Sequence, residues 1–367
     1  MIKAIKWISV LAISLILISW GSTGHRIISR NAPLSFNEEM ELFQTWGDYL
    51  ASHASDADYR KSEDPNESPR HYIDIDNYSE FVNYGYIPQT LNEAINLHGY
   101  NNVFDWGTLP WATKATFDSL KSNMAMQNWD NAKYFAADLG HYVGDGHMPL
   151  HITKNYDGQL SDNDGIHSRY ESTMIGAHAA DLTYTGEPIE QIDNVNQYIL
   201  DYIYENHKYV DSVLLADDYA VSINSSYSST EYKNALWEKT GAFTTMLFKN
   251  ASHALAELIY TAWKEAGSPS LTGIDLTNEN NTNIILEPIT PNPIIDAATI
   301  SFHLKSTANI ILTVHDINGR LVTTLAEGKL LEGDYSVNWI PSKQSPGIYF
   351  IVLNSGYNRI SRKVILE

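Results

Sequence analysis

The chain has 367 residues and a formal net charge of −20, and it contains no cysteine. A chain of this length can bury a large core and form more than one domain, but no disulfide can stabilise it. The acidic excess lies in residues 20–284, because residues 285–367 hold 7 basic and 7 acidic side chains. This charge argues against a general nucleic-acid-binding surface and against anchoring to an anionic membrane.

Residues 1–19 predict a secretory signal peptide. Lys3 and Lys6 form a basic start, an apolar run over 10–18 follows, and Ser19 offers a small residue for cleavage. The run is too short to be a convincing membrane-spanning helix, and an uncleaved anchor is the alternative interpretation.

If cleavage follows Ser19, the mature chain begins at Trp20, whose free α-amino group and carbonyl oxygen can chelate a metal ion. His25 lies five residues further on and can join it. A Trp and a His at this spacing carry little information alone. The position of Trp20 at the expected new terminus makes both residues candidate ligands.

Residues 35–54 have apolar side chains at a spacing near 3.6, which predicts a helix with Ser35 as its N-cap. The predicted inward residues are Phe36, Met40, Phe43, Trp46 and Leu50. A polar loop with two early aspartates follows and leads to His71 and Tyr72. One of these aspartates and His71 could converge on one ion, while Tyr72 is either a wall of the substrate site or a core residue.

The densest set of candidate metal ligands lies within residues 141–171. His141 and Asp145 are four residues apart, as are His167 and Glu171, so each pair would project from one face of a helix. His151 lies between the pairs. Imidazole and carboxylate are the groups that bind Zn²⁺ when no thiolate is available, so this stretch predicts a metal site.

The segment that delivers His141 is predicted to be a helix over residues 129–143. Its inward residues are expected to be Tyr134, Phe135, Leu139 and Tyr142. A break or bend is expected at Gly144, Gly146 and Pro149, which would let His151 reach a different ion from His141.

Further stretches with helical spacing cover residues 88–125, 187–213 and 229–265. Interruptions of the first are expected at Gly99, Gly107 and Pro110. No strand-like alternation precedes residue 284. Residues 20–266 are therefore predicted to form an all-α bundle with ligands projecting inward.

After residue 266 the spacing of apolar residues changes from that of helices to that of strands. Residues 267–284 are rich in Ser, Thr, Asn and Gly, which predicts a linker. The segments after it alternate as strands do, and Asn318-Gly319 predicts a tight hairpin turn. Residues 285–367 are therefore expected to form a small all-β sandwich without a ligand cluster, in which His303 and His315 are ordinary strand residues.

Residues 20–171 resemble the superfamily of bacterial zinc-dependent phospholipases C and fungal single-strand-specific nucleases. The matching features are WGxxGH, HYID, HYxGDxHxPLH and GIHSxYE. The resemblance implies an all-α fold that holds three zinc ions. The implied ligands of the first ion are Asp58, His71, His141 and Asp145. Those of the second are His151, His167 and Glu171, and those of the third are Trp20 and His25, with Asp145 bridging the third ion to the first.

Both branches of the superfamily place the loop aspartate after an alanine, which selects Asp58, preceded by Ala57, over the competing ligand Asp56. An aromatic residue after this aspartate and a glutamate as the last ligand resemble the phospholipases. The short step from Trp20 to His25 resembles the nucleases instead. The tryptophan that the nucleases carry before the alanine is absent, because Asp56 stands there.

Residues 288–367 resemble the C-terminal sorting domain of the type IX secretion system of Bacteroidetes. The matching features are PNP at 291–293, the DINGR turn, and PGIYFIVL followed by a basic and apolar end. The resemblance implies export through the periplasm to the medium or the cell surface and contact with the secretion machinery. No stable protein partner is implied.

The expected function is phosphodiester hydrolysis by a secreted zinc-dependent enzyme. A water shared by two zinc ions would lose a proton and attack phosphorus in line with the leaving group, while the third ion polarises a phosphoryl oxygen. Asp58 or Asp145 is expected to orient or deprotonate this water. A phospholipase C acting on phospholipid is favoured, a nuclease acting on single-stranded nucleic acid is the alternative, and a non-catalytic zinc-binding surface protein is the third hypothesis.

Overall fold

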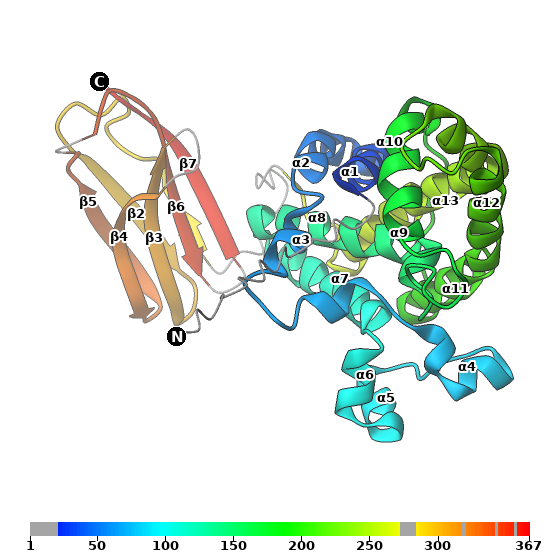
Figure 1. Ribbon diagram of the computed structural model, residues 1–367. Coiled ribbons are helices and arrows are strands. Elements are labelled where there is room, and N and C mark those ends of the chain that lie inside the picture. The colour runs from blue at the N-terminus through cyan, green and yellow to red at the C-terminus, as the bar shows by residue number, and fades with distance from the viewer. Residues whose placement is uncertain (1–20, 272–283, 317–320, 342–343, 356–357) are drawn as a thin grey trace, which may run out of the picture. The chain divides into compact units, whose positions relative to one another are not determined.

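The structure, a computed structural model, describes residues 21–271, 284–316, 321–341, 344–355 and 358–367 (Figure 1). The expected signal peptide and Trp20 lie outside these residues, as do most of the expected linker and the Asn318-Gly319 turn. The chain divides into two compact units, namely residues 1–116 with 136–258, and residues 117–135 with 259–367.

The α-helices all precede the strands (Figure 1). They are α1 (Gly21–Asn31), α2 (Gly47–Ser52), α3 (Asp56–Arg60), α4 (Ser79–Tyr84), α5 (Leu91–His98), α6 (Tyr100–Asp105), α7 (Leu109–Ala125), α8 (Trp129–Gly146), α9 (Ile166–Ser168), α10 (Ile175–His178), α11 (Val195–His207), α12 (Val210–Ile223) and α13 (Thr230–Glu265). Short 3₁₀ segments are η1 (Ala32–Ser35), η2 (Glu38–Trp46), η3 (Ser68–His71), η4 (Ile75–Asn77), η5 (Pro149–His151) and η7 (Ala179–Asp181), and η6 (Arg169–Met174) is a π-helical turn.

The segment predicted as a helix over residues 35–54 is instead a 3₁₀ segment followed by α2. The predicted inward residues are all buried, so the apolar pattern is confirmed. The prediction of Ser35 as the N-cap is wrong. The cap of η2 is Asn37, whose side chain accepts a hydrogen bond from the Glu39 N–H. The Ser35 hydroxyl is buried against the Tyr184 hydroxyl at 2.5 Å, so it is unavailable as a cap.

Helix α8 continues through Gly144 to Gly146, so the predicted break comes later than expected. A β-carbon on Gly144 would lie 2.8 Å from Nδ1 of His25, and one on Gly146 would lie 2.6 Å from the Tyr202 ring. These glycines therefore serve close packing on α8 rather than termination of the helix. Pro149 does lie beyond the helix, in the first turn of η5.

Two other helical predictions need correction. Pro110 does not interrupt its segment, because it occupies the first turn of α7, where a missing N–H costs nothing. The pattern predicted over residues 187–213 begins only at Val195, where the Asn194 side chain caps α11 by accepting the Gln197 N–H.

The strands form two antiparallel sheets. One has the order β1 (Ile284–Leu286), β2 (Ala298–Leu304), β5 (Gly333–Trp339), and the other has the order β4 (Leu321–Leu330), β3 (Ala308–Asp316), β6 (Gly347–Ser355), β7 (Asn358–Leu366). Both sheets contribute buried side chains to one apolar core. The prediction of a helical region followed by a small β-sandwich is therefore confirmed. In the part of the chain that is described, no helix is both long and apolar enough to span a bilayer.

Candidate metal centre

The predicted ligands that lie within the described residues are buried and gather into groups whose donor atoms approach within 4.8 Å of one another. Three such groups occur among the described residues. They are His25, His141 and Asp145; Asp58, His71 and His141; and His151, His167 and Glu171. Because His141 belongs to two groups, those two are parts of one site.

The first part of the site joins α3, η3 and α8. Nε2 of His141 lies 3.5 Å from Oδ1 of Asp58 and 2.9 Å from Nδ1 of His71, and that Nδ1 lies 3.6 Å from the same Asp58 oxygen. Asp58 owes its position to α3, a short helix within the segment that the sequence predicted as a polar loop.

The orientation of each imidazole is set by an outer hydrogen-bond partner. Nδ1 of His141 lies 2.7 Å from the carbonyl oxygen of Ala54, so this nitrogen keeps its proton, and Nε2 directs a lone pair inward once a cation displaces its proton. Nε2 of His71 faces the Glu67 carboxylate at 3.3 Å, so its Nδ1 directs a lone pair inward. Two lone pairs 2.9 Å apart beside a carboxylate are arranged for a cation.

Glu67 is the carboxylate that orients His71, and it is not among the residues predicted from the sequence. It is buried and accepts a hydrogen bond from the Tyr142 hydroxyl, and Arg60 and Arg70 each lie 3.4 Å from its Oε2. Although burial opposes ionisation, the bonds from His71 and Tyr142 lower the pKa of Glu67 to about 2. The spacing of four residues between Glu67 and His71 was the available signal.

Asp145 lies between the groups. Its Oδ2 is 3.1 Å from Nδ1 of His71 and 3.4 Å from Nε2 of His141, while its Oδ1 is 3.5 Å from Nε2 of His25. The same Oδ1 lies 3.4 Å from Nδ1 of His151. Burial opposes ionisation, yet the surrounding imidazoles hold the pKa of Asp145 well below its usual range. One carboxylate therefore faces all parts of the centre.

His25 reaches the centre from α1. This helix packs against α2, η6 and α10, and the His25 ring stacks on the His141 ring with 3.9 Å between centroids. Burial lowers the pKa of His25 to about 3, so its imidazole is neutral and can donate a lone pair. Trp20, its expected partner, is outside the described residues.

The remaining group is built by η5, α9 and η6. Nε2 of His151 and Nε2 of His167 lie 3.4 Å and 3.2 Å from Oε2 of Glu171. Their Nδ1 atoms lie 2.7 Å and 3.0 Å from the carbonyl oxygens of His71 and Tyr156, so these nitrogens carry protons and both Nε2 atoms face the carboxylate, where a cation could bind all three groups. Against the cost of burial, His167 and His151 lower the pKa of Glu171 to about 2. The α-helical spacing predicted for His167 and Glu171 is replaced by a π-helical turn, a feature frequent at functional sites.

The residues fit zinc on three observations. The donor set consists of imidazoles and carboxylates without thiolate, which is a zinc-binding chemistry. Oδ2 of Asp58 is buried and has no hydrogen-bond partner among the described residues, while Lys61 donates to its Oδ1 at 2.7 Å. Burial opposes protonation of His141, yet the Asp58 and Asp145 carboxylates raise its pKa to about 9. The centre therefore attracts positive charge.

This proton on His141 leads to a pH prediction for the zinc-free protein. Because the folded pKa of about 9 exceeds the ordinary value of 6.5, this group stabilises the fold fully below pH 6.5, and its contribution is lost as the pH rises toward 9. We expect the melting temperature of the apo protein to fall across this window. That of the zinc-loaded protein should fall less, because zinc replaces the proton. Parallel thermal melts from pH 6 to 9 measure the difference, and two parallel curves would contradict it.

Glu67→Gln tests the outer partner of His71. Loss of the charge should weaken zinc binding by about 10–100-fold, as removal of such partners typically does. Competition with a fluorescent chelator measures the affinity. Glu63→Gln is the control, because Glu63 lies in the same segment and is exposed. Equal affinity of the two variants would contradict the assigned role.

Asp56, the competing candidate ligand, and His147, a neighbour of Asp145, do not belong to the three ligand groups. The Asp56 carboxylate is 2.7 Å from Nδ1 of His53, so the structure brings Asp58 rather than Asp56 to the centre. His147 is buried, with Nδ1 at 2.8 Å from the Val143 carbonyl oxygen and its ring stacked on Tyr202. Burial lowers the pKa of His147 to about 4.

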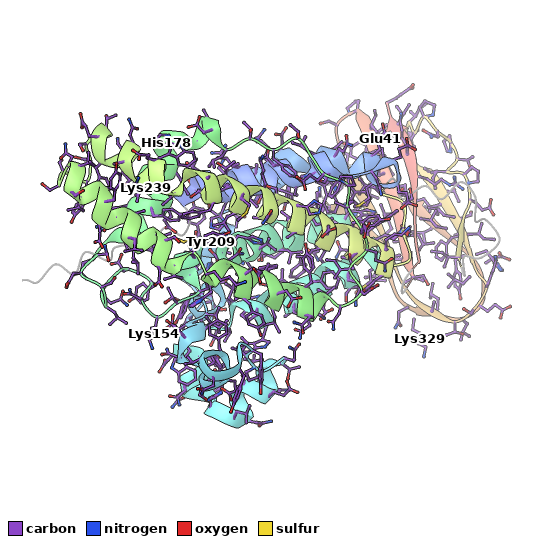
Figure 2. The ribbon with its side chains drawn as sticks, turned by 90° about the vertical axis from the view of Figure 1, so that its right-hand side faces the viewer. Glu41, Lys154, His178, Tyr209, Lys239 and Lys329 are labelled. Carbon is purple, nitrogen blue, oxygen red and sulfur yellow. The ribbon has the colours of Figure 1, made fainter. Side chains whose placement is uncertain are left out.

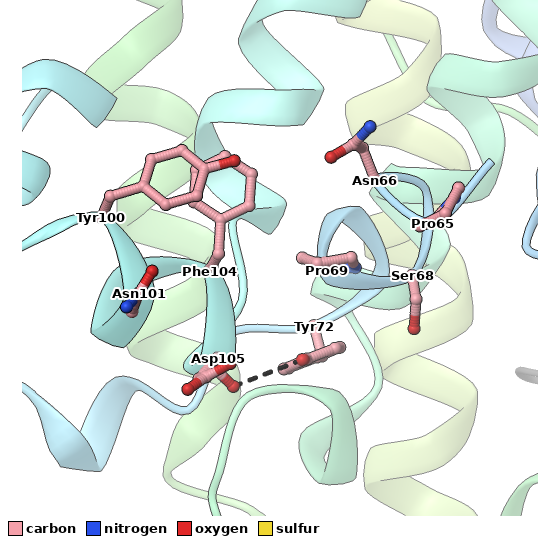
Figure 3. Close-up of a pocket in the computed structure, with 9 residues that line it drawn as sticks. All are labelled: Pro65, Asn66, Ser68, Pro69, Tyr72, Tyr100, Asn101, Phe104 and Asp105. Carbon is pink, nitrogen blue, oxygen red and sulfur yellow. Dashed lines mark hydrogen bonds between the residues drawn. The ribbon is translucent and has the colours of Figure 1, made fainter.

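A pocket of about 450 Å³ adjoins the residue next to His71 (Figure 3). Tyr72 lines it together with Tyr100, Phe104 and Asp105, and its hydroxyl donates to the Asp105 carbonyl oxygen at 3.3 Å. The Tyr72 backbone approaches Gly107 so closely that a β-carbon there would lie 2.1 Å from the Tyr72 carbonyl oxygen. Of the two roles predicted for Tyr72, the structure favours that of a wall.

Asp74 is a second acid that is not among the residues predicted from the sequence. Burial and the neighbouring Asp76 carboxylate raise the pKa of Asp74 to about 7. Nothing in the sequence distinguishes Asp74 from the solvated acids around it, because the shift depends on tertiary burial.

The C-terminal strands can be assigned by comparison. Residues 288–367 match the family described as the secretion system C-terminal sorting domain. This β-domain is a type IX secretion sorting domain. The resemblance seen in the sequence is thereby confirmed, and the sorting domain directs export of the chain, to the medium or to the cell surface, through interaction with the secretion machinery.

Comparison of the whole chain with solved structures finds only distant similarity. The chain is similar to the alpha-toxin of an avian strain of Clostridium perfringens, with 11% identity and a TM-score of 0.43 over 95% of this chain and 99% of that chain. It is also similar to the alpha toxin of Clostridium absonum, with 12% identity and a TM-score of 0.41 over 94% and 98%. No curated protein sequence matches significantly.

Proposed function

We propose that the helical region upstream of the sorting domain is a zinc-dependent phosphodiesterase of the phospholipase C type. The observation that carries the proposal is the convergence of the three buried ligand groups around Asp145. Buried carboxylates are costly unless a cation or a full set of donors compensates them, so such a centre implies function.

The ligands proposed for zinc divide among three positions. Asp58, His71, His141 and Asp145 serve one, His151, His167 and Glu171 serve another, and Trp20 and His25 with Asp145 serve the third. Zinc held there would supply Lewis-acid chemistry, which activates water and offsets the charge that develops on a phosphoryl group.

Asp58 and Asp145 have different proposed roles. Oδ2 of Asp58 has no hydrogen-bond partner among the described residues, so it can accept a hydrogen bond from the attacking water. Burial opposes ionisation of Asp58, but His141 holds its pKa well below the usual range, so this carboxylate orients the water and is a weak base. Asp145 faces the imidazoles of all the groups, so its carboxylate would be shared by the zinc positions if they were filled.

The lipid substrate is favoured by the surroundings of the Tyr72 pocket. The residues that line this pocket include no lysine or arginine, and Arg70, which lies between two of them in the chain, pairs with Glu67 at 3.4 Å. A nucleic-acid strand needs cations along its phosphate backbone, and these are missing here. A single-strand-specific nuclease is the second candidate function, because the rings of Tyr72, Tyr100 and Phe104 could also stack on bases.

The test compares apo and zinc-loaded enzyme on bis(p-nitrophenyl) phosphate. We expect turnover that disappears on chelation and returns with zinc, with circular dichroism showing that the apo protein stays folded. A parallel assay on phosphatidylcholine vesicles and single-stranded DNA separates the two substrates. Absence of metal-dependent turnover on every substrate would refute the proposal.

A further inference from the structure

Helices α4, α5 and α6 carry large apolar side chains that the fold leaves in solvent. In Figures 1 and 2 these helices, coloured light blue to cyan, extend from the lower edge of the helical bundle. The exposed side chains, which we call the α4–α6 patch, are 50–76% exposed and comprise Val82, Tyr84, Tyr86, Leu97 and Tyr100. Exposed apolar side chains gathered in one region mark an interaction site more often than scattered ones do.

The patch residues of α4 and of the turn after it are held at the surface, because neighbouring residues fix this segment to the bundle. The Phe81 ring stacks on the Tyr204 ring with 5.8 Å between centroids, and the Ile87 N–H donates to the Tyr204 hydroxyl at 3.0 Å. Tyr84 and Tyr86 lie between these anchors, and their rings stack outside the bundle with centroids 6.2 Å apart. The tyrosines are therefore held at a fixed place on the surface.

The α5 and α6 part of the patch is attached to α4. Nε2 of His98, the last residue of α5, lies 3.2 Å from Oε1 of Glu80 on α4. The Tyr100 ring stacks on the Phe104 ring with 4.1 Å between centroids. The three helices thus present their apolar side chains on one small structural unit.

The charge of this segment selects the partner. Residues 71–113 contain five acidic side chains and no lysine or arginine. The acids are Asp74, Asp76, Glu80, Glu93 and Asp105. Such a segment repels anionic lipids and nucleic acids. It suits a lipid surface without net charge, where tyrosine rings lie at headgroup level and leucine or valine reaches the acyl boundary.

The patch shares one residue with the Tyr72 pocket. Tyr100 belongs to both, and the pocket is also lined by Tyr72, which follows the candidate ligand His71 in the chain. A lipid surface that contacts the patch would present its headgroups at this pocket.

We propose that the α4–α6 patch docks the protein on a zwitterionic lipid surface, such as one of phosphatidylcholine, and so presents lipid phosphodiesters to the metal centre. The docking of the patch is independent of catalysis, whereas its purpose rests on the proposed phospholipase function.

The test uses the full chain loaded with zinc and phosphatidylcholine vesicles. The variant Tyr84→Ser with Leu97→Ser removes two patch side chains that line neither the pocket nor the metal centre. The matched control is Leu215→Ser with Ile223→Ser, which removes two apolar side chains of α12 that are 67% and 54% exposed. Co-sedimentation should show vesicle binding weakened by about tenfold or more in the patch variant and nearly unchanged in the control.

Hydrolysis of the soluble substrate bis(p-nitrophenyl) phosphate separates docking from catalysis. We expect the patch variant to retain wild-type turnover of this substrate and to lose turnover of vesicle phosphatidylcholine. If the wild type binds vesicles through the patch but hydrolyses nothing, docking stands and the proposed function fails.

Several outcomes would overturn the docking proposal. The wild type could fail to bind phosphatidylcholine vesicles, or the patch variant could bind them as tightly as the wild type does. Patch-dependent binding that favours anionic vesicles or single-stranded DNA would contradict the charge argument. A wild-type dimer that becomes monomeric in the patch variant, with vesicle binding unchanged, would assign the patch to self-association instead.

Discussion

Asp145→Asn is expected to reduce zinc-dependent turnover by more than about a hundredfold, because loss of even an outer partner of a metal ligand typically costs 10–100-fold. Asp145 faces all the ligand groups, with its oxygens 3.1–3.5 Å from imidazole nitrogens of His71, His141, His151 and His25. An amide of the same size keeps the packing but removes the negative charge that these groups share.

Zinc content distinguishes loss of a ligand from loss of a base. Elemental analysis of the purified Asp145→Asn protein should find about one zinc ion fewer per molecule than in the wild type, because a bridging carboxylate is shared between positions. A variant that keeps all its zinc and loses only turnover would identify Asp145 as a catalytic base rather than a bridge.

Asp56→Asn is the matched control for this measurement. It makes the same chemical change at an aspartate two residues from Asp58, where the carboxylate is half-exposed and bonded to His53. Its zinc content and turnover should equal those of the wild type. If Asp56→Asn loses zinc, Asp56 rather than Asp58 is the ligand, and the assignment of Asp58 is wrong.

The sequence predicted the members of the site better than it predicted their surroundings. His141 with Asp145, and His167 with Glu171, were found because a spacing of four residues puts two side chains on one helical face. Glu67 and His71 have the same spacing, but a polar, charged segment surrounds Glu67, and such segments are usually solvated. Only the tertiary fold buries that segment.

The partners that orient the imidazoles could not be predicted. Nδ1 of His141, of His151 and of His167 bonds a backbone carbonyl oxygen, at Ala54, His71 and Tyr156 respectively. Every residue has such a carbonyl, so no side-chain pattern marks the ones that are used. These contacts depend on how α8, η5 and α9 pack.

The errors in the predicted helices have the same origin. Gly144 was expected to break its helix because glycine has low helix propensity, at a cost of about 1 kcal/mol. Instead its missing side chain makes room for His25, and α8 continues. The β-sandwich was easier to predict, because residues of β2 alternate between the core and the surface along the strand.

The position of the segment that carries His167 and Glu171 also depends on the buried ion pair between Arg169 and Asp217. Loss of this pair is expected to have the largest effect on stability. Arg169 is buried and donates to both carboxylate oxygens of Asp217, at 3.2 Å and 2.7 Å. It also donates to the Tyr232 hydroxyl and stacks over the Tyr227 ring at 4.1 Å. Its Nη1 and Nη2 also donate to the carbonyl oxygens of residues 164 and 163, just before the ligand segment.

Arg169→Met should therefore lower the free energy of unfolding by about 3–5 kcal/mol, because it leaves the buried Asp217 carboxylate without its cation. Urea unfolding of the zinc-free protein measures this change without a contribution from the metal. Lys208→Met is the matched control. It removes the cation of an exposed pair with Glu205 and should cost less than about 1 kcal/mol.

The double variant Arg169→Met with Asp217→Leu separates the charge from the packing. If the unpaired carboxylate is what destabilises Arg169→Met, removal of Asp217 as well should recover part of the lost stability, whereas loss of contacts alone would make the double variant worse. Because Arg169 also positions the chain before His167, zinc binding should stay weak in the double variant even where stability returns. Full recovery of both would contradict the positioning role and leave Arg169 with a purely electrostatic one.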